Sequence, residues 1–365
     1  MKPGFVFAAI AAAFLVIACG GSHQDKPCTP GGDGSYVVKP FDNLSQYCLV
    51  SIKAGKIALQ PAAISYDLNT PLFSDHAQKS RAVWLPPGKS ASYDESKAFD
   101  FPTGAVLIKS FGFTDDLRNA DAAVSWLETR LLIKTDAGWQ GYAYIWNDAR
   151  TEATLDYGGR VQAISLLDEG GARQQANYLI PSFNQCKQCH ETAGAGSMGL
   201  LGVKARNLNR DFAYPAGAEN QLAHWSRLGL LTGAPAPSAA PRLAAWSDAT
   251  TGSVAERARA YLEVNCSHCH SATGAAGPTG LYLTGSETNA TRLGICKPPV
   301  AAGQASGNLK YDVVPGNPDA SIVAYRLQST EPGTAMPQIG RSLVHQKGVT
   351  LIRDWISGLS GSCPN

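Results

Sequence analysis

Two short stretches of the chain hold residue types that could do redox or metal chemistry. "CKQCH" runs from Cys186 to His190, and "CSHCH" runs from Cys266 to His270. In both, two cysteines stand three positions apart and a histidine directly follows the second. Two thiols on one turn can reach the two vinyl groups of a porphyrin, while the adjacent imidazole approaches the iron from below. This is the pattern of c-type haem attachment, so we expect two haem c groups.

Two other interpretations of these stretches are weaker. A zinc site would need a second ligand pair at zinc-finger spacing, and the two cysteine pairs are 80 residues apart. A thioredoxin-like dithiol would leave the repeated histidine unexplained. His268, inside the second motif, is expected at the haem edge. The predicted thioether residues are Cys186, Cys189, Cys266 and Cys269, and the predicted proximal iron ligands are His190 and His270.

The second axial ligands are harder to predict. The chain has three methionines including the initiator, so Met336, before the terminal helix, is the expected sixth ligand of the second iron. The alternative is that Met336 packs against the ring without bonding iron, and His345 is a weaker candidate. For the first iron the leading candidate is His224, with Met198, His76 and an open site as the alternatives.

In an exported protein, the cysteines outside the two motifs are expected to be modified or paired. Nine cysteines are present, and thiols outside the cytoplasm are readily oxidised. Outside the two motifs and Cys19, four remain, which allow three pairings. Their order along the chain favours Cys28–Cys48 and Cys296–Cys363, since each bridge would staple one terminal region.

The N-terminus predicts the compartment. Residues 1–18 have one basic residue and an apolar run too short to span a bilayer, which is typical of a cleaved signal peptide. The run ends in "VIAC", which resembles the bacterial lipobox, and this implies that Cys19 is lipidated. Gly20 follows instead of aspartate, so the resemblance implies an outer-membrane lipoprotein facing the periplasm. The net charge of +2 comes without a block of like charge, so no nucleic-acid partner is expected.

The fold class follows from the pattern of elements. After a lipidated tether over 19–52, alternating β-branched and aromatic residues predict a β-rich domain over 53–182, an antiparallel sheet or sandwich that carries the first haem. Asp136-Ala137-Gly138 is expected to turn between two of its strands. Pro181 prevents a continuous helix into Cys186, so an extended approach is expected. Residues 183–250 are expected to form the first haem segment, with short helices and a Pro/Ala linker.

Residues 251–365 are expected to form an all-α domain. Ser253 is a candidate N-cap for a helix that leads into the second motif. With its second motif, this helix and a methionine before a terminal helix, the domain resembles class I cytochrome c. The resemblance implies that the terminal helix crosses the helix that contains Tyr261. It also implies that Gly277-Pro278 supplies the carbonyl that receives the His270 N–H. The expected apolar face of the terminal helix comprises Leu351, Ile352, Trp355, Ile356 and Leu359.

A broader resemblance covers nearly the whole mature chain. Together with "CKQCH", the segments "SYDLNTPLFSDHAQKSRAVWLPPG", "NQLAHWSRLGLL", "VVPGNPDASIVAYRL" and "AMPQIG" look like a little-characterised family of dihaem c-type cytochrome lipoproteins. The resemblance implies two haems and periplasmic electron transfer with periplasmic or membrane redox proteins as partners. It names no substrate.

Two functions therefore compete. The first is an electron carrier, in which the axial ligands and the burial of each haem set its potential. The alternative is a dihaem redox enzyme, peroxidase-like, with a five-coordinate first haem. About 165 mature residues precede the first motif, which is unlike dihaem peroxidases, where the first haem domain is helical and near the N-terminus. A gas or redox sensor is a more distant third interpretation.

Overall fold

The computed structural model describes Met1, residues 28–190 and residues 198–364. The predicted lipidation residue Cys19 lies outside the described residues. The centre of the molecule is a six-stranded antiparallel sheet in which β3 and β9 are the edges. Its strands, in spatial order, are β3 (Ile64–Ser65), β4 (Gln78–Trp84), β6 (Val106–Phe113), β7 (Ser125–Thr135), β8 (Gly138–Trp146) and β9 (Ala153–Asp156).

The two faces of this sheet differ because alternate side chains of a strand point to opposite sides. One face is apolar and packs against the N-terminal segment around Tyr36, Leu44 and Tyr47. The other face carries charged residues in the middle of β4, β6 and β7. Asp136 and Ala137 form the turn between β7 and β8, in which Thr135 pairs with Gly138, as the sequence predicts.

Four smaller strand pairs surround the sheet, three of them antiparallel hairpins and one a short parallel pair. The hairpin of β10 and β11 leads directly into the first cysteine motif. The pairs are β1 (Val50–Lys53) with β2 (Lys56–Leu59), β10 (Arg160–Leu167) with β11 (Arg173–Ile180), β12 (Asp211–Tyr214) with β13 (Gly217–Asn220), and β5 (Ala91–Ser92) with β14 (Leu231–Thr232).

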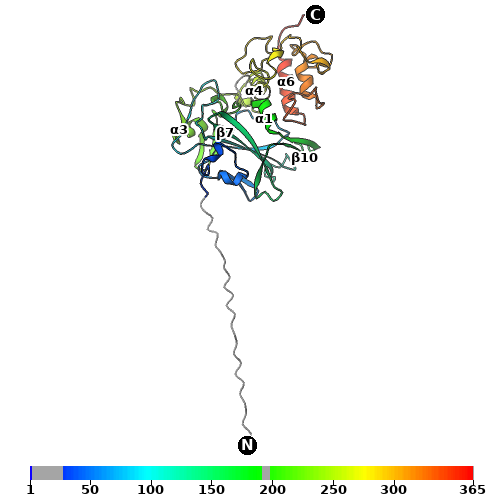
Figure 1. Cartoon of the computed structure of the whole chain (residues 1–365). Coiled ribbons are helices and arrows are strands. Elements are labelled where there is room, and N and C mark those ends of the chain that lie inside the picture. Colours follow the sequence, from blue (N-terminus) through cyan, green and yellow to red (C-terminus); the bar gives the residue numbers. More distant parts are fainter. Residues whose placement is uncertain (2–27, 191–197, 365) are drawn as a thin grey trace.

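Six short α-helices complete the described chain. In Figure 1, α1 lies between the sheet that contains β7 and the part of the molecule formed by α4 and α6. The helices are α1 (Phe183–His190), α2 (Ala205–Leu208), α3 (Gln221–Arg227), α4 (Val254–Cys266), α5 (Ile322–Gln328) and α6 (Gln346–Ser357).

The expected fold class is wrong. The molecule is mostly sheet, with 26% strand and only 21% helix, and no all-α cytochrome c domain is evident in the described residues. Residues 251–364 hold three helices separated by long loops and 3₁₀ turns such as Gly277–Thr279 and Pro318–Ala320. Glycine and proline are frequent in these connections, and both disfavour a helix interior.

Local features of this region were predicted correctly. Ser253 is the N-cap of α4. Its hydroxyl accepts from the Glu256 N–H, and the Glu256 carboxylate accepts from the Ser253 N–H. α4 and α6 pack against each other. The predicted face of α6 is buried except at its end, because the helix ends at Ser357, before Leu359.

Candidate functional site

The first motif forms the helix α1, which begins just after a strand. β11 ends at Ile180, Pro181 interrupts the backbone pattern, and the helix starts at Phe183, so the approach is extended as expected. A reciprocal pair of hydrogen bonds between Ser182 and Gln185 caps this start, at 2.9 and 3.3 Å. One turn later come the two free thiols Cys186 and Cys189.

α1 is held on the sheet through an aromatic contact. The Phe183 ring stacks on Tyr142 of β8 with 6.2 Å between centroids, and Tyr157 meets the same ring edge-on at 6.2 Å. Phe183 thus holds α1 against β8, and Cys186 and Cys189 line one cavity together with Arg130 of β7.

The His190 imidazole is oriented for metal binding. Its Nδ1 lies 2.8 Å from the carbonyl oxygen of Gly199, so Nδ1–H donates and Nε2 is left available. Burial lowers the pKa of His190 to about 4, which keeps the ring neutral. A neutral imidazole with a donor bond on its far nitrogen is the form in which histidine binds iron.

A cavity of about 490 Å³ opens beside this motif. This volume falls within the roughly 300–1,000 Å³ of ordinary ligand pockets. Its wall combines the motif with the charged face of the sheet and with loops that follow α5. Its lining includes Arg81, Lys109, Arg130, Cys186, Cys189, His190, Tyr261, His268 and His345.

The second motif begins at the last residue of α4. The helix ends at Cys266, and the next turn closes through bonds from Cys269 N–H and His270 N–H to the Cys266 carbonyl, at 3.1 and 2.9 Å. Cys266 and Cys269 are free thiols. The His270 Nδ1 is buried and makes no hydrogen bond within the described chain.

The structure does not show the expected partner of His270. Gly277 and Pro278 form a 3₁₀ turn, and within the described residues neither carbonyl bonds the ring. Burial lowers the pKa of His270, and the Leu281 backbone opposes this shift. Leu281 is therefore a candidate for this role.

Met336 lies in the wall of the cavity beside the second motif. This cavity has a volume of about 620 Å³, and its wall also holds Cys266, Cys269 and His270. The Met336 N–H donates to the Arg326 carbonyl at 3.0 Å, and the Arg341 guanidinium donates to the Met336 carbonyl. The backbone on both sides of the thioether is thus fixed, as a sixth ligand would require.

The two motifs meet. Cys189 and Cys269 are 80 residues apart in the chain, yet each thiol shifts the pKa of the other, upward for Cys189 and downward for Cys269. Cys189, Asn265 and His268 line both cavities. The cavities therefore share a wall built from the motifs themselves.

His224 is placed elsewhere. Its ring stacks on Tyr214 with 3.5 Å between centroids, and its Nδ1 lies 2.6 Å from the Glu219 carboxylate, which also pairs with Arg227. His224 is not among the described residues that line either cavity. The structure therefore does not bring the leading candidate for the sixth ligand to the first motif. Helical spacing predicts which residues share a face of α3, but not what that face contacts.

The other candidates fall in three different places. Met198 is buried against β8, where its sulfur approaches Gly141, and it is outside both cavity walls. His76 meets the Phe73 ring edge-on. His345 does line the first cavity: its ring lies flat on Phe73 at 4.1 Å, and its Nδ1 is 3.0 Å from the Tyr261 hydroxyl.

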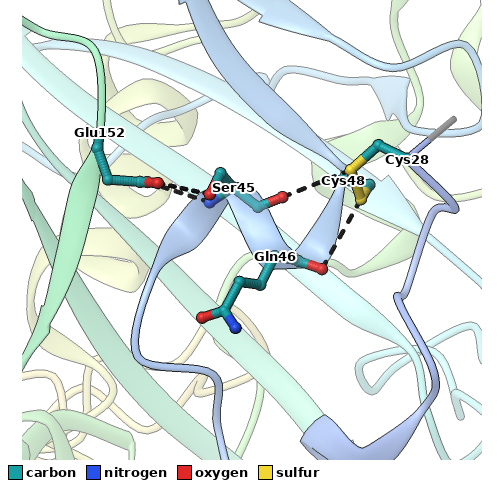
Figure 2. Close-up of a disulfide and its surroundings, with 5 residues drawn as sticks. All are labelled: Cys28, Ser45, Gln46, Cys48 and Glu152. Carbon is teal, nitrogen blue, oxygen red and sulfur yellow. Dashed lines mark hydrogen bonds between the residues drawn. A yellow bond between two sulfur atoms is a disulfide. The ribbon is translucent and has the colours of Figure 1, made fainter. Parts of the chain in front are cut away.

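The four cysteines outside the motifs form two disulfides. Cys28 is bonded to Cys48 and Cys296 to Cys363, with Cα–Cα distances of 5.5 and 5.1 Å. Figure 2 shows the first bridge, beside Ser45, whose N–H and hydroxyl donate to the Glu152 carboxylate. This bridge and these bonds fasten the start of the described chain to the sheet just before β9.

The residues present fit c-type haem better than a bare metal ion. Within the described residues, no three His, Cys, Asp or Glu side chains converge to hold a metal. Each motif instead offers two free thiols and one imidazole beside a cavity of ligand size. None of the helices in the described part of the chain is long and apolar enough to cross a membrane. Comparisons with protein-family models, with curated proteins and with solved structures found no match to this chain.

Proposed function

We propose that the protein is a dihaem c-type cytochrome that transfers electrons in the periplasm. The observation that carries this proposal is the meeting of the two motifs, with Cys189 beside Cys269 and one cavity on each side. A haem c at each motif would supply a one-electron iron couple. The chain would hold both cofactors by covalent bonds at two motifs that lie side by side, an arrangement suited to passing electrons between redox partner proteins.

Mass spectrometry of the unfolded holoprotein tests the cofactor content. We expect two haems retained per wild-type chain, and one haem in each of the double variants C186S/C189S and C266S/C269S. The matched control is C28S/C48S, which removes two cysteines outside the motifs and should keep both haems. Haem that acid acetone extracts from the wild type would contradict covalent attachment.

We also propose that lipid on Cys19 tethers the protein to the outer membrane. The proposal rests on the lipobox-like "VIAC" and on the disulfide Cys28–Cys48, which fastens the chain nine residues later to the body of the protein. Replacing Cys19 with Ser should move the protein from the membrane fraction to the soluble periplasm. Unchanged fractionation would contradict lipidation.

The position of His224 favours a second candidate function, a dihaem redox enzyme. With His224 engaged by Glu219 and Tyr214, the first iron site has one fewer candidate for a sixth ligand. An open coordination position at the first haem would admit a substrate such as peroxide. Carbon monoxide binding at the first haem separates the two functions, because only an open coordination position admits it.

A further inference from the structure

Three cations stand side by side on the face of the sheet that borders the first cavity. Arg81 of β4 lies directly opposite Lys109 of β6, and Lys109 lies directly opposite Arg130 of β7. All three line the cavity that also holds His190. Like charges directly opposite one another on a sheet are destabilising, so this row requires nearby negative charge.

The carboxylates of the described chain do not provide a partner for each of the three cations. Glu128 is occupied by Arg130, whose Nε donates to it at 2.8 Å. Asp67 accepts from Arg81 at 2.6 Å. Lys109, in the middle, has no carboxylate partner in this part of the chain, and its ammonium lies 4.7 Å from the centroid of the adjacent Phe111 ring.

Arg81 also has donor atoms without partners. Its side chain is only 5% exposed, yet Nε and one Nη are buried without a hydrogen-bond partner among the described residues. A buried donor without a partner costs about 1–3 kcal/mol, and more when charged. Burial and the neighbouring cations also depress the pKa of Lys109 well below its usual range.

The second cavity provides a contrast. Its lysine, Lys297, is paired with Asp312 at 3.1 Å. Lys109 of the first cavity thus lacks, within the described chain, the carboxylate partner that the lysine of the second cavity has.

We propose that Arg81, Lys109 and Arg130 form a carboxylate site that binds the propionates of a haem attached at Cys186 and Cys189. The inference rests on the proposed function. A haem carries two carboxylates at one edge, and guanidinium and ammonium groups bind carboxylates with short, charge-assisted bonds. The row lines the same cavity as His190. The ligand, the iron-binding imidazole and the cations thus share one cavity.

Spectroelectrochemical titration of the holoprotein tests this site. A buried positive charge near an iron favours the reduced state, so Lys109→Gln should lower one of the two haem potentials and leave the other unchanged. Arg81→Gln should lower the same potential. Lys109→Arg keeps the charge and should retain the wild-type value. Lys134→Gln is the matched control, since Lys134 lies on β7 outside the cavity wall, and it should shift neither potential.

The outcomes separate the inference from the proposed function. If wild-type chains retain two haems but Lys109→Gln and Arg81→Gln move neither potential, the propionate site is wrong and the cytochrome assignment stands. If no haem is retained at Cys186 and Cys189, both fail. A diffusible anion is tested by adding acetate or phosphate to the wild type. If the haem potential varies with the added anion in the wild type but not in Lys109→Gln, the site binds a free anion and not the propionates.

Discussion

At the scale of single residues, the chemistry depends on pairs of groups that local sequence places together. A CxxC pair puts two thiols on one turn, and the histidine that follows needs only one backbone carbonyl to set its tautomer, as Gly199 does for His190. The thiols and the imidazole are predictable because five consecutive residues place them. The carbonyl that orients the imidazole lies further along the chain, and the one expected for His270 does not bond it in the described residues. Axial ligands from elsewhere are not predictable, because their position depends on the whole chain path.

Met336 is the residue whose replacement has the clearest expected effect. A thioether ligand favours ferrous iron relative to an imidazole, so Met336→His should lower the potential of the second haem. The sulfur-to-iron charge-transfer band should disappear from its absorption spectrum. Met198→Leu is the control, because Met198 packs against Gly141 outside both cavities and its loss should leave the band intact. A band that survives in Met336→His would point to Met198 as the ligand of the first haem.

At the scale of elements, the β12–β13 hairpin and α3 are joined by one carboxylate. The Arg227 guanidinium and the His224 ring lower the pKa of Glu219 to about 2. A carboxylate whose folded pKa is below its unfolded value stabilises the fold above the unfolded pKa, about 4.3, and loses this effect as the pH falls through the folded pKa. The contact should therefore be strongest near neutral pH.

Urea unfolding at several pH values tests this contact. Glu219→Gln should have a lower free energy of unfolding than the wild type at pH 6. This difference between the two free energies should narrow as the pH falls from about 4.3 towards 2. Glu95→Gln, which changes an exposed carboxylate outside every ion pair of the described chain, is the matched control and should show no such gap. A gap of constant size at all pH values would mean that the Glu219 charge is not its origin.

The two disulfides constrain elements over different lengths of chain. Cys28–Cys48 closes a separation of 20 residues and Cys296–Cys363 one of 67. In the chain-entropy account each bridge contributes about 2–4 kcal/mol, and the longer loop contributes about 1 kcal/mol more. Paired Cys→Ser variants, compared by urea unfolding, should show the larger loss for Cys296 and Cys363. Equal losses would indicate that loop entropy does not dominate.

At the scale of the whole molecule, the sequence predicts local signals and not long-range placement. Ser253, the turn at Asp136 and the apolar face around Trp355 all formed as expected, because each is decided by neighbours along the chain. The all-α domain was wrong because loops rich in glycine and proline replace helix between α4, α5 and α6.

The cation row was missed for a related reason. "KSRAV", "LIKSF" and "ETRLL" each place a basic residue inside a strand, which is a visible signal of a polar face. That Arg81, Lys109 and Arg130 stand level with one another depends on strand register, which these short patterns do not define. The place of His345 in the wall of the first cavity was not predictable either, because it depends on the path of the chain from the first motif to the last helix.

The coordination of the proposed first haem distinguishes the electron carrier from the enzyme. His345 lies in the wall of the first cavity, and its Nδ1 is engaged by the Tyr261 hydroxyl, which leaves its other ring nitrogen available to iron. We expect His345 to be the sixth ligand, so the reduced wild type should bind no carbon monoxide. His345→Ala should open one haem to carbon monoxide, whereas His224→Ala should open neither, because Glu219 and Tyr214 hold that ring outside the cavity wall.

Absorption spectra of the reduced holoprotein under carbon monoxide make this measurement directly. Met336→His serves as a control on the second haem, which should stay closed to carbon monoxide because the substitution exchanges one strong ligand for another. A wild-type protein that binds carbon monoxide at one haem and turns over peroxide with a reduced donor would show a five-coordinate first iron. The enzyme would then replace the carrier, and the Arg81–Lys109–Arg130 row would border a substrate cavity.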